Sequence, residues 1–150
     1  MPSSLRCGSF ADVLVALDRL PLVPSSPSRP QRFTPAQTLV HCAQSIEYSM
    51  TGYPRLRSGL FRATVGRLVK RKFLRAGSMS HDLAAGIAGA ADPAADADLA
   101  SAMARLRAAI ASFRGHEGPL GPHLAYGPCS KSDYEKLHSM HVADHLGVWM

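Results

Sequence analysis

Apolar side chains recur every three or four residues in five segments of this chain, the spacing that buries one face of an α-helix. The clearest example is the series Leu99, Met103, Leu106, Ile110 and Phe113. The five expected helices cover approximately residues 10–20, 34–50, 58–76, 93–114 and 130–148. No segment alternates apolar and polar residues over the length of a useful strand. The pattern therefore predicts an all-α fold, a four-helix bundle with one additional basic helix and long loops.

Capping signals define where these helices begin. Thr34 is followed by a proline at the first helical position and by Gln37 three residues after the cap, which together make a strong helix start. Similar capping boxes open at Ser9 and at Ser130, and Ser58 is expected to cap the basic helix. The Pro/Ser-rich stretch 21–30 and the Ala/Gly-rich stretch 84–95 are expected to be loops.

Length and composition fit one domain spanning residues 1–150. The mean hydropathy is −0.04, and no apolar run approaches the roughly 18 residues that a membrane span needs. The 3 cysteines are widely spaced and form no CxxC motif, which argues against a disulfide framework and a zinc ribbon. With no secretory signal recognisable at the N-terminus, we expect a cytoplasmic protein without a membrane partner.

The net charge of +6 is unevenly distributed. No acidic residue lies between Glu47 and Asp82, whereas this interval holds eight basic ones: Arg55, Arg57, Arg62, Arg67, Lys70, Arg71, Lys72 and Arg75. A solvated helix face explains this asymmetry more simply than an anionic partner does. Because no nucleic-acid-binding motif accompanies the charge, no specific nucleic-acid partner is expected.

The last predicted helix carries His138, His141 and His145 within one narrow arc, while Lys136, Ser139 and Ala143 are expected to point away. That arc is the stripe that a helix normally buries, and burying imidazoles without partners costs roughly 1–3 kcal/mol each. The i, i+4 pair of His141 and His145 can bind one metal ion. Carbonyl groups, or the carboxylates of Glu135 and Asp144, could satisfy the rings instead, and spacing alone does not decide between these alternatives.

The remaining histidines offer candidates for a third ligand. His41 projects nearly opposite the apolar stripe of its helix, onto a polar face that lies on the surface or lines a wet pocket. His81 and His116, near helix ends and loops, are most simply surface residues. His123 lies in a Pro/Gly loop, where it caps backbone groups or contacts a pocket rim. His138 lies two helical turns from His145, which favours an outer position around the site or a contact with a neighbouring helix.

Two blocks of short motifs resemble a known family. Near the C-terminus these motifs are Pro122-His123, Gly127, Ser130, Asp133-Tyr134, Leu137 and His141-Val142-Ala143-Asp144-His145-Leu146. Earlier in the chain they are Phe33, Thr34-Pro35-Ala36-Gln37, Leu39-Val40-His41, Ser45-Ile46, Ser49 and Gly52. With them the chain resembles the DinB-like (DinB/YfiT) superfamily of four-helix metal-binding proteins, and within it a branch of unknown function. The core motifs span residues 33–149.

This resemblance implies that His41, His141 and His145 occupy the three metal-ligand positions of the superfamily. It also implies a divalent ion, zinc or nickel, and a thiol-dependent transferase that acts with a low-molecular-weight thiol on a small electrophilic substrate. Gln37, Tyr48 and Tyr134 are pocket candidates. Asp144 stands where the family often has a further histidine, and no residue is singled out as a general base.

The main alternative is a metal-binding or stress-associated protein without turnover, whose basic helix binds an acidic partner. A structural bundle whose histidines satisfy one another is a further alternative. The sequence leaves the oligomeric state open, with a homodimer among the options.

Overall fold

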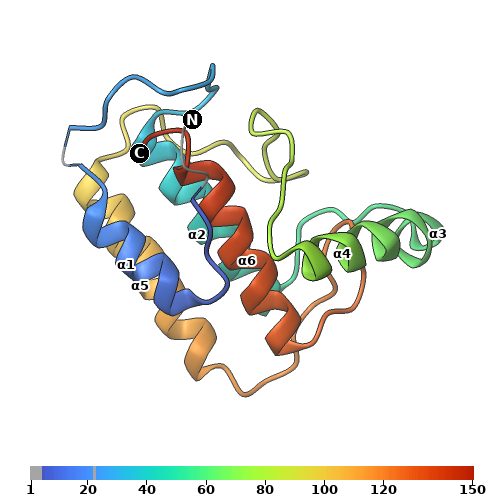
Figure 1. Cartoon of the computed structure of the whole chain (residues 1–150). Helices are drawn as coiled ribbons and strands as arrows, with labels where there is room; N and C mark the ends of the chain where they lie inside the picture. Colours follow the sequence, from blue (N-terminus) through green and yellow to red (C-terminus); the bar gives the residue numbers. More distant parts are fainter. Residues whose placement is uncertain (1–4, 22) are drawn as a thin grey trace.

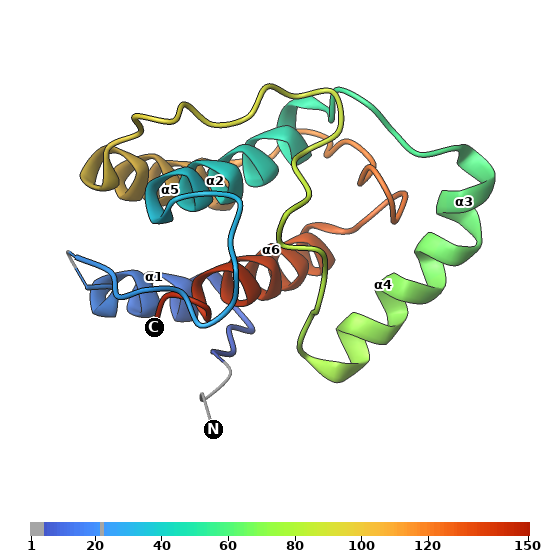
Figure 2. The ribbon, with the colours of Figure 1, turned by 90° about the horizontal axis from the view of Figure 1, so that it is seen from above.

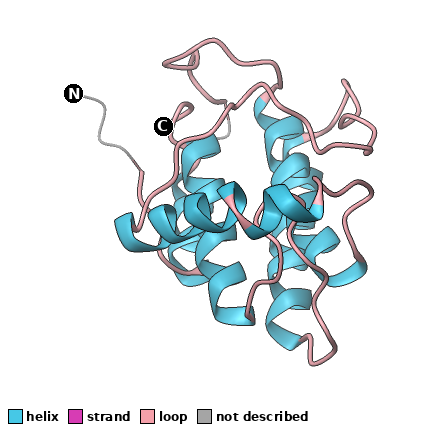
Figure 3. Cartoon of the chain, turned by 90° about the vertical axis from the view of Figure 1, so that its right-hand side faces the viewer, coloured by secondary structure: helices cyan, strands magenta, loops and turns pink. Residues whose placement is uncertain are grey.

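The computed structural model describes residues 5–21 and 23–150, and in this part of the chain the ordered elements are helices joined by loops (Figures 1 and 3). The helices are α1 (Phe10–Arg19), α2 (Pro35–Thr51), α3 (Gly59–Ala63), α4 (Val65–Ala76), α5 (Leu99–Gly115) and α6 (Lys131–Leu146). The described residues form no strand, only an isolated bridge between His123 and Gly127. The all-α prediction is confirmed. None of the described helices is both long enough and apolar enough to cross a membrane.

Four helices make up the bundle, and they lie in two layers (Figure 2). One layer holds α2 and α5 and the other holds α1 and α6, with contacts both within and between the layers. The backbone N–H of Phe10 at the start of α1 donates to Oε1 of Glu135 on α6 at 3.1 Å. The first and last helices are therefore joined by a polar contact as well as by the apolar core.

Helix α2 is buried on two sides. Its apolar stripe, with Leu39 and Ile46, belongs to the hydrophobic core. The opposite polar face is also covered, because α2 contacts α6 as well as α5, and it buries His41 and Ser45. Of the two alternatives for this face, surface or pocket lining, the structure selects the pocket.

Helix α6 is the most enclosed element of the bundle. Buried residues occur all around it, including Tyr134, Ser139, Ala143 and Leu146. The expectation that Ser139 and Ala143 point away is therefore wrong. A helix with neighbours on several sides has no single apolar stripe, and α6 contacts α1, α2 and α4.

The basic segment differs from the single helix that was expected over residues 58–76. The backbone of Thr64, with φ −113° and ψ −92°, separates α3 from α4. The two helices lie beside the bundle (Figure 2). Gly66 lets α4 approach the loop before α6 closely, because a Cβ at that position would lie 1.8 Å from the carbonyl oxygen of Ala125.

The segment between α4 and α5 is the expected loop, but it extends further than the sequence indicated. The helix predicted from Pro93 begins at Leu99, after the N-cap Asp98. Between Gly77 and Asp98 the chain crosses the bundle on the side of α2 and α6 (Figure 2). We call residues 78–98 the crossing loop.

Candidate metal centre

Three histidine rings from two helices face a common point. His41 comes from α2, and His141 and His145 lie one turn apart on α6. The Nε2 atoms of His41 and His141 are 3.3 Å apart, and one nitrogen from each ring lies within 4.8 Å of the other two. The arrangement that the resemblance implied for residues 41, 141 and 145 is thus a possible metal site in the folded chain.

Burial keeps these imidazoles neutral at physiological pH. Removal from water, reinforced by His81, lowers the pKa of His41 to about 4. Burial and then His41 and His81 lower the pKa of His145 to about 2, and burial also lowers the pKa of His141 well below 6.5. A neutral imidazole retains the lone pair that a metal ligand needs.

The donor set fits a divalent ion. Nitrogens about 2.0–2.1 Å from a tetrahedral zinc lie about 3.3–3.4 Å apart, close to the observed His41–His141 spacing. Nδ1 of His141 is buried and has no hydrogen-bond partner among the described residues. This nitrogen is not the one that faces His41, so it would carry the ring proton while Nε2 binds an ion. Imidazole ligands suit zinc, nickel, copper and iron alike.

His81 is the main correction to the sequence analysis. It was expected to be a surface residue, yet its side chain is only 22% exposed, and its Nε2 lies 3.1 Å from Nε2 of His145. The crossing loop folds back onto α6, where the backbone N–H of His81 donates to Oδ2 of Asp144 at 3.1 Å. Helical periodicity carries no information on where a loop packs. The sequence held one indication of a further histidine at the site. Asp144 precedes the proposed ligand His145, and a carboxylate in that position can orient another histidine.

A cavity of about 190 Å³ lies against this cluster. We call it the histidine cavity, since its lining includes five histidines: His41, His81, His123, His138 and His141. Apolar side chains, among them Ile87, Leu124 and Leu137, supply much of the remaining wall. The space suits a small molecule whose reacting group reaches the histidine cluster.

His123 serves both roles that were open for it, since it caps backbone groups and lines the histidine cavity. Its Nδ1 accepts hydrogen bonds from the backbone N–H groups of Ala125 and Tyr126 at 3.1 and 3.2 Å. Burial, followed by the charge of Lys70, lowers the pKa of His123 to about 3, so the ring is neutral. With Nδ1 accepting, its proton lies on Nε2, which makes this ring a hydrogen-bond donor and not a base.

His138 faces neighbouring helices and is packed among aromatic rings. It stacks on Tyr134 with ring centroids 5.2 Å apart and meets the ring of Phe113 edge-on at 5.7 Å. Its Nε2 is buried and unpaired within the described residues. Burial, with a smaller effect from His123, lowers the pKa of His138 to about 3.

The other polar candidates do not line the histidine cavity. Gln37 completes the cap of α2 and donates to the carbonyl of Pro93 at 3.0 Å, and the hydroxyl of Tyr134 donates to the carbonyl of Gly121 at 2.6 Å. Neither they nor Tyr48 lines the cavity, so the expectation of a pocket role for them is wrong. His116 caps the end of α5, and it too is absent from the cavity wall.

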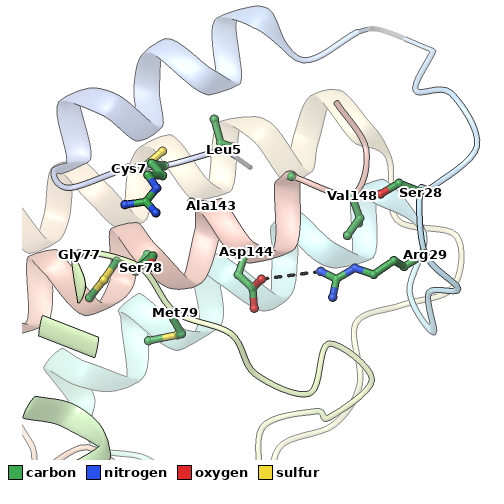
Figure 4. A pocket seen from close by; sticks show the side chains of 13 residues that line it. Leu5, Cys7, Ser28, Arg29, Gly77, Ser78, Met79, Ala143, Asp144 and Val148 are labelled. Atoms are coloured by element: carbon green, nitrogen blue, oxygen red, sulfur yellow. Dashed lines mark ion pairs between the residues drawn. The ribbon is translucent and has the colours of Figure 1, made fainter. Parts of the chain in front are cut away.

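A second, larger cavity of about 310 Å³ lies near the N-terminal segment and the end of α6 (Figure 4). Asp144 lines it, and Nη2 of Arg29 lies 3.8 Å from Oδ1 of that carboxylate. None of its lining residues is a histidine. Met79 lines both cavities, and Asp144 lies beside His81 and His145, so the larger cavity adjoins the candidate metal centre through these two residues.

The cysteines contribute no reactive group to this site. Burial raises the pKa of Cys7 and of Cys129 to about 11, and full burial raises that of Cys42 further. All three are free thiols. Their protonated state at neutral pH makes them poor nucleophiles and poor metal ligands.

Comparison with known proteins identifies a family but no relative of known activity. A family model described as "Protein of unknown function (DUF1569)" matches residues 2–149. This family is grouped with the DinB/YfiT-like proteins, in agreement with the resemblance seen in the sequence. Comparison with curated proteins and with solved structures found no significant match.

Proposed function

The chain belongs to the DUF1569 family, whose function is unknown, and from its site we propose that it is a divalent-metal-dependent enzyme acting on a small molecule. His41, His141 and His145 are the proposed metal ligands. The observation that carries this proposal is the convergence of three neutral imidazoles, two buried and one half-buried, at one side of the histidine cavity.

The chemistry follows from the donor set and the shape of the cavity. An ion held by three imidazoles supplies Lewis acidity at an open position and lowers the pKa of a bound water or thiol. The apolar wall around Leu124 and Leu137 keeps water away from a reacting group. The Nε2–H of His123 is positioned to donate to a substrate oxygen or halogen in the cavity.

The specific reaction we propose is transfer of an electrophilic group from an organic halide to a low-molecular-weight thiol: the sulfur bonds to the carbon, the carbon–halogen bond breaks, and halide and the thiol proton leave to solvent. The resemblance to DinB-like proteins supports it, and the chain's own chemistry is consistent with it. None of Cys7, Cys42 and Cys129 lines the histidine cavity, so in this proposal the reacting sulfur comes from a separate molecule.

Metal content tests the first part of this proposal. Protein purified without a nickel column should hold close to one equivalent of a divalent metal by elemental analysis. The double variant His141→Ala/His145→Ala should lose that metal, whereas His116→Ala should retain it, because His116 lies outside the cluster. Metal content that is unchanged by the double substitution would overturn the metal centre.

Turnover tests the second part. The metal-loaded protein should accelerate the reaction of a panel of small thiols with an aromatic halide, and a chelator should abolish the acceleration. A correctly folded, metal-loaded protein that accelerates none of these reactions would contradict the proposed transferase activity while leaving the metal centre intact.

One observation favours a second candidate, a metal-binding protein whose basic helices bind an acidic protein. Leu60 is 77% exposed and Leu68 is 65% exposed, on the same basic segment that lies beside the bundle. Apolar side chains among arginines and lysines match an acidic amphipathic surface. Binding of an acidic amphipathic peptide should weaken steeply with added salt and should be lost in the double variant Arg67→Glu/Arg71→Glu. If the double variant still turns over substrate as the wild type does, the enzyme is favoured over the second candidate.

A further inference from the structure

His81 is attached to α6 through one carboxylate. Oδ2 of Asp144 accepts the backbone N–H of His81 at 3.1 Å and lies 2.7 Å from its Nδ1. The contact with Nδ1 is close but is not a hydrogen bond, so the backbone hydrogen bond is the one that holds the loop to Asp144. In the tautomer that carries its proton on Nδ1, beside this carboxylate, the lone pair of His81 lies on Nε2.

Nε2 of His81 faces His145, at the edge of the group formed by His41, His141 and His145. Its Nε2 is 3.1 Å from Nε2 of His145, and its ring centroid is 4.8 Å from the centroids of both His141 and His145. His41 contacts the same two rings, at centroid distances of 5.2 and 4.8 Å. The two short nitrogen pairs, at 3.1 and 3.3 Å, lie slightly below and at the spacing of about 3.3–3.4 Å that is expected for neighbouring ligands of a tetrahedral zinc.

From this geometry we propose that His81 is a fourth metal ligand, positioned by Asp144, which closes the coordination position that three histidines leave open. The inference rests on the metal centre of the proposed function and adds to it a closed state of the site. An arrangement of carboxylate, imidazole and metal is a common way to orient a histidine ligand.

The crossing loop couples this ligand to the histidine cavity. Met79, Ala85, Gly86 and Ile87 of the same loop form part of the cavity wall. Most of residues 84–96 are exposed, and hydrogen bonds from Arg32 to the carbonyl of Ala84 and from Gln37 to the carbonyl of Pro93 tie this part of the loop to the bundle. Departure of His81 therefore opens a coordination position and one side of the cavity together, so that a small molecule gains access to both.

The competing explanation is a hydrogen bond between the two rings. Nε2 of His81 and Nε2 of His145 could share one proton at 3.1 Å without any metal. In that arrangement His81 only stabilises the loop, and it contributes nothing to metal affinity or to the ligand field. The two explanations predict different coordination numbers, and therefore different spectra, for a metal bound at the site.

Cobalt(II) provides the test, because its visible spectrum depends on the number of ligands and on their geometry. Apo-protein loaded with Co²⁺ should give a spectrum that millimolar azide does not change. In His81→Ala, azide should change the spectrum, Zn²⁺ affinity should fall at least about tenfold, and added imidazole should restore the azide-insensitive spectrum. Asp144→Asn should lower Zn²⁺ affinity about 10–100-fold and should make the spectrum partly azide-sensitive.

Controls separate this inference from the proposed function. His116→Ala should match the wild type, and far-UV circular dichroism should verify the fold of each variant. If His81→Ala has the wild-type spectrum and a Zn²⁺ affinity within twofold of it, while His41→Ala loses metal, His81 is not a ligand and the metal centre stands. If the wild type binds no Co²⁺ or Zn²⁺, both the metal centre and the inference are overturned.

Discussion

Replacing His138 with phenylalanine should make the stability of this protein less sensitive to acid. The ring is packed between aromatic side chains, and burial lowers its pKa from 6.5 to about 3. Between these two values the unfolded chain holds a proton on this residue and the folded chain does not. The unfolded state therefore binds more protons, and stability falls as the pH decreases through 6.5 toward 3.

The size of the effect follows from the shift in pKa. Each pH unit below 6.5 removes about 1.4 kcal/mol from the free energy of unfolding until the folded-state pKa is reached. Between neutral pH and pH 5 the loss due to His138 alone is therefore on the order of 2 kcal/mol. Other buried histidines add losses of the same sign, so the comparison must be made between variants at matched pH.

The assay is urea denaturation of metal-free protein, followed by circular dichroism at pH 7.5 and at pH 5. Between these conditions, His138→Phe should lose about 2 kcal/mol less stability than the wild type. His138→Gln should show the same difference, since neither replacement titrates and their packing effects cancel in the comparison. His116→Ala should behave as the wild type does. A difference below about 0.5 kcal/mol for both His138 variants would refute a neutral, buried ring at this position.

Three further outcomes are expected. Gly66→Ala should displace α4 and expose the loop before α6 to hydrogen exchange, because the new Cβ would lie 1.8 Å from the carbonyl oxygen of Ala125. The control Gly115→Ala should leave exchange unchanged, because its Cβ would meet no neighbouring atom within 4 Å. Tyr134→Phe should cost about 1 kcal/mol of stability in urea denaturation, because it removes the 2.6 Å hydrogen bond to the carbonyl of Gly121. Zinc at one hundred times its dissociation constant should stabilise the wild type by about 2.7 kcal/mol in thermal denaturation, and equal stability of the apo and zinc-loaded protein would argue against a specific site.

Local chemistry in the sequence located the helix starts well. Ser9, Thr34, Ser58 and Ser130 are N-caps in the structure, each accepting a hydrogen bond from a backbone N–H three residues later. The start of α5 was predicted too early because Pro93 also resembles a first helical residue. In the folded chain its carbonyl binds the side chain of Gln37, and the helix begins after Asp98.

The parts of the candidate site that lie close together in the sequence could be predicted, and the parts that depend on distant segments could not. The spacing of His141 and His145 is a property of one helix, and the sequence shows it directly. His41 lies on a different helix, so its place beside them came from the resemblance and not from periodicity. His81 depends on a loop folding back to Asp144, a tertiary contact that no repeating pattern in the sequence encodes.

The protonated, buried thiols have a practical consequence for the study of this protein. A chain whose Cys7 and Cys42 are shielded from solvent should survive aerobic handling without an added reductant. Screening can then use each candidate thiol at a known concentration, with no dithiothreitol competing for the metal. Because Cys129 is only half-buried, a Cys129→Ser variant would establish that sulfur consumed in such an experiment comes from the compound supplied and not from the polypeptide.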